Sequence, residues 1–336
     1  MTIPYRTQRV LKRIALIALA LAVLLAVIWV CWMLWVQRYI VYSADGSVRL
    51  DFDLPPIGSG QLATRPEDPD IPIRLDKDDE MLGTTEFAKM NGYYVELAEL
   101  QDIAAVKAQI QALPAGTAVM IDVKSIQGAF YYSSAVGSAR SSRINTEQFD
   151  DLLATLKRSN LYTIARLPAL RDYTYGLNHV PDGVHHSSGG YLYMDDDGCY
   201  WLHPASEGTL SYLTQIIMEL KNLGFDEVVL DDFCFPETTS ILVNGDKAEL
   251  LTRAANVLLS ACATDSFAVS FVKSAEFTMP DGRSRMYLEG LDAAQAANAA
   301  QNSGVSDTEV KLVFLTELHD TRFDVYSVMR PLSGAH

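Results

Sequence analysis

The sequence is poor in cysteine and in basic residues, and both shortages restrict what the protein can be. Of four cysteines in 336 residues, Cys31 lies in a long apolar run, leaving Cys199, Cys234 and Cys262. These three show no CxxC spacing, so we predict no zinc site, at most one disulfide bond, and buried thiols. Lys and Arg number 27 against 42 Asp and Glu, for a net charge of −15. Such a chain does not fit a nucleic-acid partner, because phosphate neutralisation requires clusters of cationic side chains.

Three further absences narrow the fold and the chemistry. No glycine-rich fingerprint follows the first predicted strand, which disfavours a dinucleotide-binding, doubly wound sheet. No internal repeat is visible. His185 and His186 have no third ligand nearby in the sequence, and the DDDG run at 195–198 lacks the alternating ligands of a calcium loop. We therefore expect no metal ion and no cofactor.

A long uncharged, apolar run, Ile14–Val36, is present near the N-terminus. Its length suits a helix that crosses a bilayer core of about 30 Å. Four basic residues precede it within 1–13, and only Arg38 follows closely, so the positive-inside rule places residues 1–13 in the cytoplasm. A cleaved signal peptide would have a shorter apolar region that ends in small residues rather than tryptophans. We predict a single-pass protein of the cell membrane, in contact with the lipid bilayer through 14–36, with an extracytoplasmic C-terminal domain.

Beyond the apolar run the chain falls into two parts. Residues 37–90 are rich in Pro, Gly and Asp and show little periodicity, so we interpret them as a linker with one short strand near Ser47–Phe52. In residues 91–336, short apolar segments alternate with helical patterns, which predicts βαβ units and a parallel sheet. The predicted strands are 92–97, 117–123, 161–167, 227–232, 267–272, 285–290, 310–318 and 323–329.

The fold class predicted from this alternation is α/β, a (β/α)8 TIM-like barrel. Predicted helices cover 102–113, 145–160, 207–223, 248–263 and 292–300, and residues 189–206 form a predicted hairpin excursion. The last four strands are crowded into 267–329, where only one helix is clear. We therefore expect the last part of the barrel to be irregular.

Charged residues stand at the ends of the predicted strands. Functional groups of such a barrel come from the C-terminal strand ends, which here hold Glu96, Asp122, Lys124, Arg166, Asp231, Asp232, Ser270, Lys273, Glu289 and Glu317. Neighbouring strand residues point to opposite faces, so only one of Asp231 and Asp232 should point inward from the strand itself. Asp122 and Lys124 are expected either to form a buried ion pair or to position a substrate. Arg166 is expected to pair with a neighbouring carboxylate.

Four stretches resemble a known family: AVMIDVKSIQGAFYYSS (118–134), LYTIARLPALRD (161–172), YWLHPAS (200–206) and LKNLGFDEVVLDDFCFP (220–236). Their order and spacing are similar to those of bacterial putative glycoside-hydrolase domains, which are amylase-like and occur in cell-envelope proteins. The resemblance implies a TIM barrel that acts on an envelope or extracellular polysaccharide. It also implies Asp231 as a catalytic carboxylate. Residues that would bind the sugar are Asp122, Lys124, Arg166, Asp232, His203 and Trp201.

The chain departs from the family pattern at several positions. Cys234 replaces the family's arginine, which removes a fixed cation from the neighbourhood of Asp231. His203 stands where the family has an aspartate, and the fifth strand offers Ser270 in place of another. The family's late Pro-Met-x-Tyr-Pro motif is missing. These departures leave open an alternative: a catalytically inactive barrel that binds glycan or serves as an envelope scaffold.

Glycoside hydrolysis requires a second carboxyl group opposite the first. Glu276, Glu289 and Glu317 are candidates for the proton donor, and we rank Glu317 first because it follows a clearly predicted strand. Aromatic side chains around the hairpin, among them Tyr191 and Tyr193, could stack on sugar rings or simply pack on each other.

Overall fold

The computed structural model describes residues 87–274 and 277–334, together with Trp29, Trp32 and two short strands, β1 (Ile40–Tyr42) and β2 (Val48–Leu50), which pair antiparallel. The chain divides into two compact units, Met1–Asp79 and Glu80–His336. The predicted span Ile14–Val36 lies outside the described residues except for Trp29 and Trp32. Within the described part, no helix combines the length and the apolar character needed to cross a membrane.

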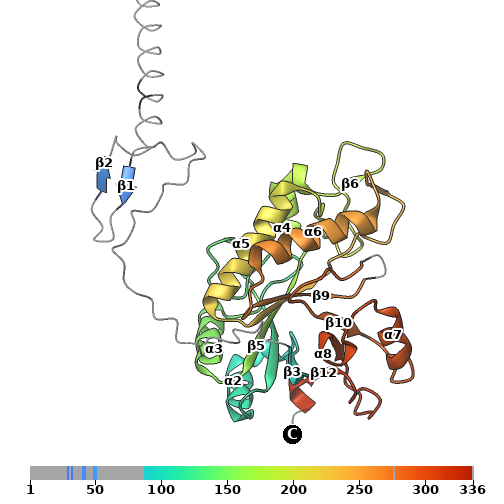
Figure 1. The fold of residues 1–336 in the computed structure, drawn as a ribbon. Coiled ribbons are helices and arrows are strands. Elements are labelled where there is room, and N and C mark those ends of the chain that lie inside the picture. Colours follow the sequence, from blue (N-terminus) through green and yellow to red (C-terminus); the bar gives the residue numbers. More distant parts are fainter. Residues whose placement is uncertain are drawn as a thin grey trace, which may run out of the picture. The chain divides into compact units, whose positions relative to one another are not determined.

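Eight parallel strands of the second unit close into a barrel (Figure 1). In order around the ring they are β3 (Asn91–Val95), β4 (Ala118–Asp122), β5 (Tyr162–Pro168), β7 (Glu227–Asp231), β9 (Ala268–Val272), β10 (Met286–Glu289), β11 (Leu312–Leu315) and β12 (Ser327–Pro331). Pairing of β12 with β3 completes the ring. The predicted barrel is confirmed, and each observed strand overlaps its predicted segment.

Helices cover the first half of the barrel more completely than the second. The described helical elements are η2 (Glu99–Asp102), α2 (Ile103–Ala112), α3 (Thr146–Arg158), α4 (Tyr173–Asn178), η3 (Val180–Asp182), α5 (Glu207–Leu223), α6 (Lys247–Cys262), α7 (Ala296–Asn302), α8 (Thr308–Lys311) and η4 (Leu332–Gly334). The described parts of the β9–β10 and β11–β12 connections contain no helix, and α7 and α8 are short. The last part of the barrel is therefore irregular in its helices, as expected, while its strands pair in regular parallel register.

Local sequence signals explain where the long helices begin and end. The Asn145 side chain accepts a hydrogen bond from the backbone N–H of Gln148 at 3.0 Å, which satisfies a free donor at the start of α3. Gly224 ends α5 with a φ of +102°, a left-handed conformation that glycine adopts without a Cβ penalty. These capping residues determine where α3 begins and α5 ends, and therefore where the loops to the neighbouring strands begin.

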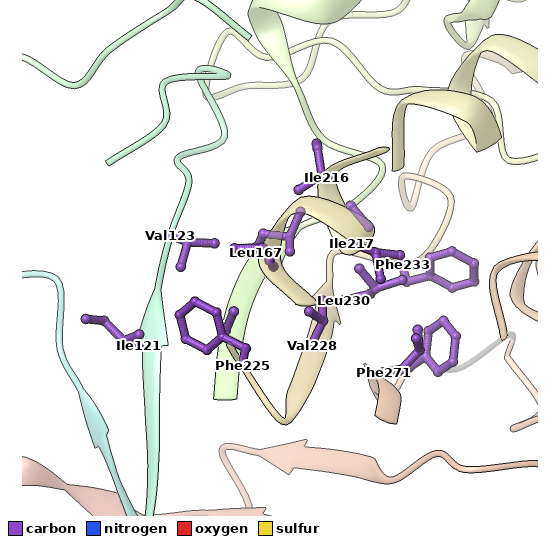
Figure 2. Close-up of a cluster of buried hydrophobic side chains, with 14 of the residues drawn as sticks. Ile121, Val123, Leu167, Ile216, Ile217, Phe225, Val228, Leu230, Phe233 and Phe271 are labelled. Atoms are coloured by element: carbon purple, nitrogen blue, oxygen red, sulfur yellow. The ribbon is translucent and has the colours of Figure 1, made fainter. Parts of the chain in front are cut away.

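The main hydrophobic core lies between the strands and the helices. Figure 2 shows part of it: Ile121, Leu167 and Val228 extend from β4, β5 and β7, and Ile216 and Ile217 from α5. All five side chains are fully buried. The alternating pattern of the strands therefore turns one set of residues toward the helices and leaves the other set for the barrel interior.

The barrel interior is filled by a second, smaller cluster: Met90, Ala118, Met120, Ile164, Val229, Tyr287, Val313, Leu315 and Met329. Because side chains alternate along a strand, residues two positions further along face the same interior, nearer the C-terminal mouth. These are Asp122 after Met120, Arg166 after Ile164, Asp231 after Val229 and Glu289 after Tyr287. The same rule places Tyr162, Glu227 and Arg285 at the opposite end. The interior thus has a polar layer at each end of an apolar middle.

Gly92 in β3 provides a test of this packing. A Cβ at this position would lie 2.3 Å from the carbonyl oxygen of Ala118, its partner in β4. We expect Gly92→Ala to lower the free energy of unfolding by about 1–3 kcal/mol, because overpacking forces the backbones apart. Thermal denaturation of the purified protein measures this loss, and an unchanged melting temperature would contradict the close approach.

Candidate functional site

A cavity of about 220 Å³ opens at the C-terminal ends of β4, β5 and β7. Its lining residues are Leu97, Asp122, Lys124, Ser125, Ile126, Tyr131, Arg166, Pro168, Asp231 and Asp232. Five of them were predicted as site residues from the sequence. The structure thus brings Asp122, Lys124, Arg166, Asp231 and Asp232 to one place, at the end of the barrel where such folds hold their functional groups.

The two neighbouring aspartates both line this cavity because the backbone turns between them. Asp231 is the last residue of β7, and Asp232 has a φ of +49°, in the left-handed region that residues other than glycine rarely adopt. The Asp231 carboxylate accepts a hydrogen bond from the Asp232 backbone N–H at 2.8 Å. Strained backbone of this kind clusters at functional sites. Asp232 lies just beyond the strand, in the loop, and it still lines the cavity.

Two carboxyl groups near Asp231 have raised pKa values. Burial and then the charge of Asp231 raise the pKa of Asp232 to about 6. The same two causes, in the same order, raise the pKa of Glu289 at the end of β10. A carboxylate surrounded by acids with raised pKa values is the arrangement that separates a general acid from a general base.

Arg166 bridges carboxylates from different sides of the mouth. Its Nε lies 2.6 Å from Asp122 Oδ1, its Nη2 lies 3.3 Å from Asp122 Oδ2, and its Nη1 lies 2.8 Å from Glu289 Oε1. The predicted pairing of Arg166 with a carboxylate is confirmed. In the ring, β4 and β10 are separated by four steps in either direction, so this guanidinium fixes two opposite strands to each other.

Lys124 does not pair with Asp122, and the predicted ion pair between them is wrong. Its Nζ lies 2.7 Å from Asp172 Oδ2, with both side chains almost completely buried. The Tyr212 hydroxyl donates to the same oxygen at 2.9 Å, and the Tyr175 N–H donates to Asp172 Oδ1 at 2.8 Å. Asp122 is occupied by Arg166, so Lys124 finds a carboxylate further along the chain. Sequence reasoning missed Asp172, although it ends one of the family-like stretches and caps α4.

Trp201 and His203 do not line the cavity. Trp201 is 7% exposed, and its Nε1–H donates to Asp195 Oδ2 at 2.9 Å. Arg171 binds the same carboxylate at 2.6 Å and lies 5.5 Å from the centre of the Trp201 ring. The half-buried His203 ring meets Phe235 edge-to-face at 5.7 Å, and burial, with the charge of His185, lowers the pKa of His203. The geometry gives both residues a part in holding the hairpin and its neighbouring loops.

Two other candidate residues, Glu317 and Ser270, do not line the cavity. Glu317 is exposed, two residues beyond β11, and after burial it is the largest cause of the raised pKa of Tyr94. Ser270 is buried and accepts a hydrogen bond from the Arg285 N–H at 2.9 Å, away from the mouth. Glu276 lies outside the described residues. Glu317 as proton donor stays a prediction.

The cysteines take no part in the cavity wall. Cys199 and Cys262 carry free, buried thiols, and burial raises the pKa of the Cys199 thiol to about 12. A thiol held protonated in this way is a poor nucleophile and a poor metal ligand.

The closed parallel barrel gathers an aspartate pair, a clamped arginine and two further acids at its C-terminal mouth, and glycoside hydrolysis requires a pair of carboxyl groups. The chain belongs to the family described as "Putative glycosyl hydrolase domain", which matches residues 93–269. The resemblance stated from the sequence is therefore confirmed. No curated protein matches the chain.

Several solved structures are similar to the chain. A hypothetical protein from Ruminiclostridium thermocellum is 21% identical, with 54% of this chain and 96% of that chain covered and a TM-score of 0.45. The α-galactosidase TtGalA from Thermus thermophilus is 12% identical over 55% of this chain and 38% of its own, with a TM-score of 0.42. The glycoside hydrolase domain of a PelA variant from Pseudomonas aeruginosa is 12% identical over 73% and 95%, with a TM-score of 0.44.

Proposed function

We propose that the protein is a membrane-anchored glycoside hydrolase that cleaves a cell-envelope or extracellular polysaccharide. The observation that carries the proposal is the shared placement of Asp231 and Asp232 in the cavity at the mouth of the barrel. Their backbone hydrogen bond fixes one relative to the other, and Arg166 holds the two further acids, Asp122 and Glu289, around them. A sugar bound there would meet one carboxylate and one carboxylic acid at once.

The chemical step follows from these two states. Asp232, as the carboxylic acid, gives its proton to the glycosidic oxygen while the bond from that oxygen to the anomeric carbon breaks. Asp231, as the carboxylate, stabilises the positive charge that develops at the anomeric carbon. Water then adds its hydroxyl group to the anomeric carbon, and its remaining proton goes to Asp232. Both aspartates are thereby returned to their starting states.

The pKa of Asp232 predicts a pH profile for the reaction. Because the donor must be protonated and its pKa in the free protein is raised to about 6, kcat/KM should fall about tenfold for each pH unit above that value. An initial-rate profile from pH 4 to 8 measures this limb. A limb that persists unchanged in Asp232→Asn would assign it to another group.

The same pKa has a consequence for stability. A carboxyl whose pKa is higher in the folded than in the unfolded state contributes stability that is complete below pH 3.8 and is lost as the pH rises through 6. Asp232→Asn removes this loss, so the variant should be more stable than the natural protein at pH 8, by on the order of 1–3 kcal/mol. Urea denaturation at pH 4 and pH 8 provides the comparison.

A parallel assay decides which acid donates the proton. The full-length protein and its Asp232→Asn, Glu289→Gln and Glu317→Gln variants are incubated with a panel of bacterial polysaccharides, and new reducing ends are counted. The proposal expects the largest loss for Asp232→Asn, of about 10²–10⁴-fold. The largest loss in Glu289→Gln or Glu317→Gln would move the proton donor to that residue. Binding without cleavage by the natural protein would favour the alternative, an inactive glycan-binding barrel.

The membrane anchor and the cellular location rest on the sequence. The uncharged run Ile14–Val36 and the basic residues before it support a single crossing with residues 1–13 in the cytoplasm and the barrel outside. Protease added to intact cells should then digest the barrel domain. Complete protection of the domain would reverse the proposed orientation.

A further inference from the structure

A second, larger hollow lies beyond the cavity, between the hairpin excursion and the loop after β7. Its volume is about 840 Å³, and its lining residues are Leu177, Val180, His186, Gly190, Tyr191, Leu192, Tyr193, Met194, Asp196, Tyr200, Glu237, Thr238 and Ser240. Its two walls are joined by a two-stranded sheet of β6 (His185–His186) and β8 (Ile241–Leu242), and by a hydrogen bond from Ser187 N–H to the Ser240 carbonyl at 2.9 Å. In the view of Figure 1 this sheet lies with α4 at the upper end of the barrel domain.

The hollow presents aromatic rings that are held in place before any ligand arrives. Tyr191 keeps 56% of its surface exposed, an unusual state for a large aromatic side chain, while its ring stacks on His186 at 4.9 Å. The Ser188 hydroxyl donates to the Tyr191 hydroxyl at 3.1 Å, which fixes the other end of the ring. Tyr200 is fixed in the same way, stacked on Tyr173 at 5.4 Å and 14°. Rigid, exposed rings bind a ligand without a further loss of side-chain entropy.

The polar side chains of the lining, apart from the phenol hydroxyls of the tyrosines, are carboxylates, aliphatic hydroxyls and the His186 imidazole. Asp196 and Glu237 supply carboxylates, Thr238 and Ser240 supply hydroxyls, and none of the residues lining the hollow is Lys or Arg. Acceptors of this kind suit a ligand with many hydroxyl donors, and aromatic faces suit its C–H groups. The lining favours a neutral polyhydroxylated chain and disfavours an anionic one.

The walls of the hollow are linked to the candidate site through the hairpin and the loop after β7. Asp195, next to Asp196 in the hairpin, binds Arg171, whose charge also acts on Asp232. Glu237 follows Asp232 by five residues in the same loop. A polysaccharide long enough to lie across both would be cleaved at the cavity and held beyond it.

We propose that this hollow is a glycan-binding subsite, which holds the part of a neutral polysaccharide chain that extends away from the cleavage point, with Tyr191 as its stacking platform. The inference rests on the proposed function for the identity of the polymer. It makes a separate claim, that chain binding depends on the hollow and not on the catalytic aspartates.

Native affinity electrophoresis tests the claim with four neutral polymers as probes: laminarin, galactomannan, xylan and xyloglucan. Full-length Asp231→Asn protein, which binds without cleaving, should be retarded by at least one of these gels. In the same background Tyr191→Ala should bind that polymer about tenfold more weakly, while Tyr191→Phe, which keeps the ring, should bind as before. Retardation by none of the four polymers, or equal retardation of Tyr191→Ala and its parent, overturns the proposal.

A kinetic comparison separates this inference from the proposed function. Tyr191→Ala in the otherwise natural protein should raise KM for the retarding polymer and leave kcat nearly unchanged, because the residue is remote from the reacting bond. If Tyr191→Ala loses binding and the natural protein cleaves no polymer, the subsite proposal stands and the proposed hydrolase activity is wrong. If the polymer is cleaved and Tyr191→Ala leaves KM unchanged, the hydrolase activity stands and the subsite proposal is wrong.

Discussion

Asp231→Asn should reduce polysaccharide hydrolysis by at least about 10²–10⁴-fold while the barrel remains folded. Asparagine has nearly the same size, and its side-chain oxygen can still accept the hydrogen bond from the Asp232 N–H. What it lacks is the negative charge that would stabilise the developing cation at the anomeric carbon. The measurement is kcat on the polymer that the natural protein cleaves, with circular dichroism as the check on folding.

Two further results make this prediction specific. The Asp197 carboxylate, 69% exposed on the hairpin, provides a matched control, and Asp197→Asn should leave kcat within about twofold, as surface ion pairs contribute little. Removal of the Asp231 charge should also lower the pKa of Asp232 toward that of an ordinary aspartate, since this charge is the second cause of the raised value. Carbon-13 titration of the Asp232 carboxyl can follow that shift. Equal kcat for Asp231→Asn and the natural protein would remove Asp231 from the chemistry.

The barrel could be predicted from the sequence because its physical signals are local. Each strand is a short apolar run, and the charged residue that follows it marks the end that faces solvent. Val229 and Asp231 illustrate the rule: one fills the barrel interior and the other, two positions later, lines the cavity. The positions of the strands and the faces of their residues follow from such patterns without knowledge of the partner strands.

The pairing of charges across the mouth could not be predicted in the same way. Arg166 and Glu289 are 123 residues apart, and only closure of the ring brings β5 and β10 within reach of one guanidinium. Lys124 finds Asp172 rather than Asp122 because Asp122 is already held by two nitrogens of Arg166. Alternation of faces also misses Asp232, because that rule assumes extended backbone and this residue has a φ of +49°.

The replacement of the family's arginine by Cys234 has a smaller effect than the sequence suggested. Arg166 lies close enough to Asp231 for their charges to interact, and Arg171 does the same for Asp232. Both arginines come from the end of β5 and the loop that follows it, rather than from the family-like stretch at 220–236 that holds Cys234. Cations therefore remain beside both aspartates, which supports retained chemistry over the inactive alternative.

The largest loss of stability is expected from the polar layer at the opposite end of the barrel, where Glu227 is fully buried. Arg285 Nη1 lies 2.6 Å from its Oε2, and the hydroxyls of Tyr162 and Tyr287 donate to it, both at 2.9 Å. Arg285 also donates to the carbonyl groups of Val310 and Ala88, so the cluster connects β5, β7 and β10 to the chain entering β3 and β11. These contacts tie the half of the barrel where helices are short to β5 and β7, and they hold these strands together from inside.

Glu227→Gln should lower the free energy of unfolding by about 3–5 kcal/mol, because it leaves the buried Arg285 charge without its counter-ion. Arg285→Met should cost a similar amount by leaving Glu227 unpaired, and the double variant should recover part of the loss, since no buried charge is then left alone. The matched control is the exposed pair on α6, where Glu249→Gln removes the bond to Arg253 and should cost under about 0.5 kcal/mol. Chemical denaturation of the natural protein and the four variants, all in the same mild detergent, measures the differences. A cost for Glu227→Gln no greater than that for Glu249→Gln would show that the buried cluster does not hold this end of the barrel closed.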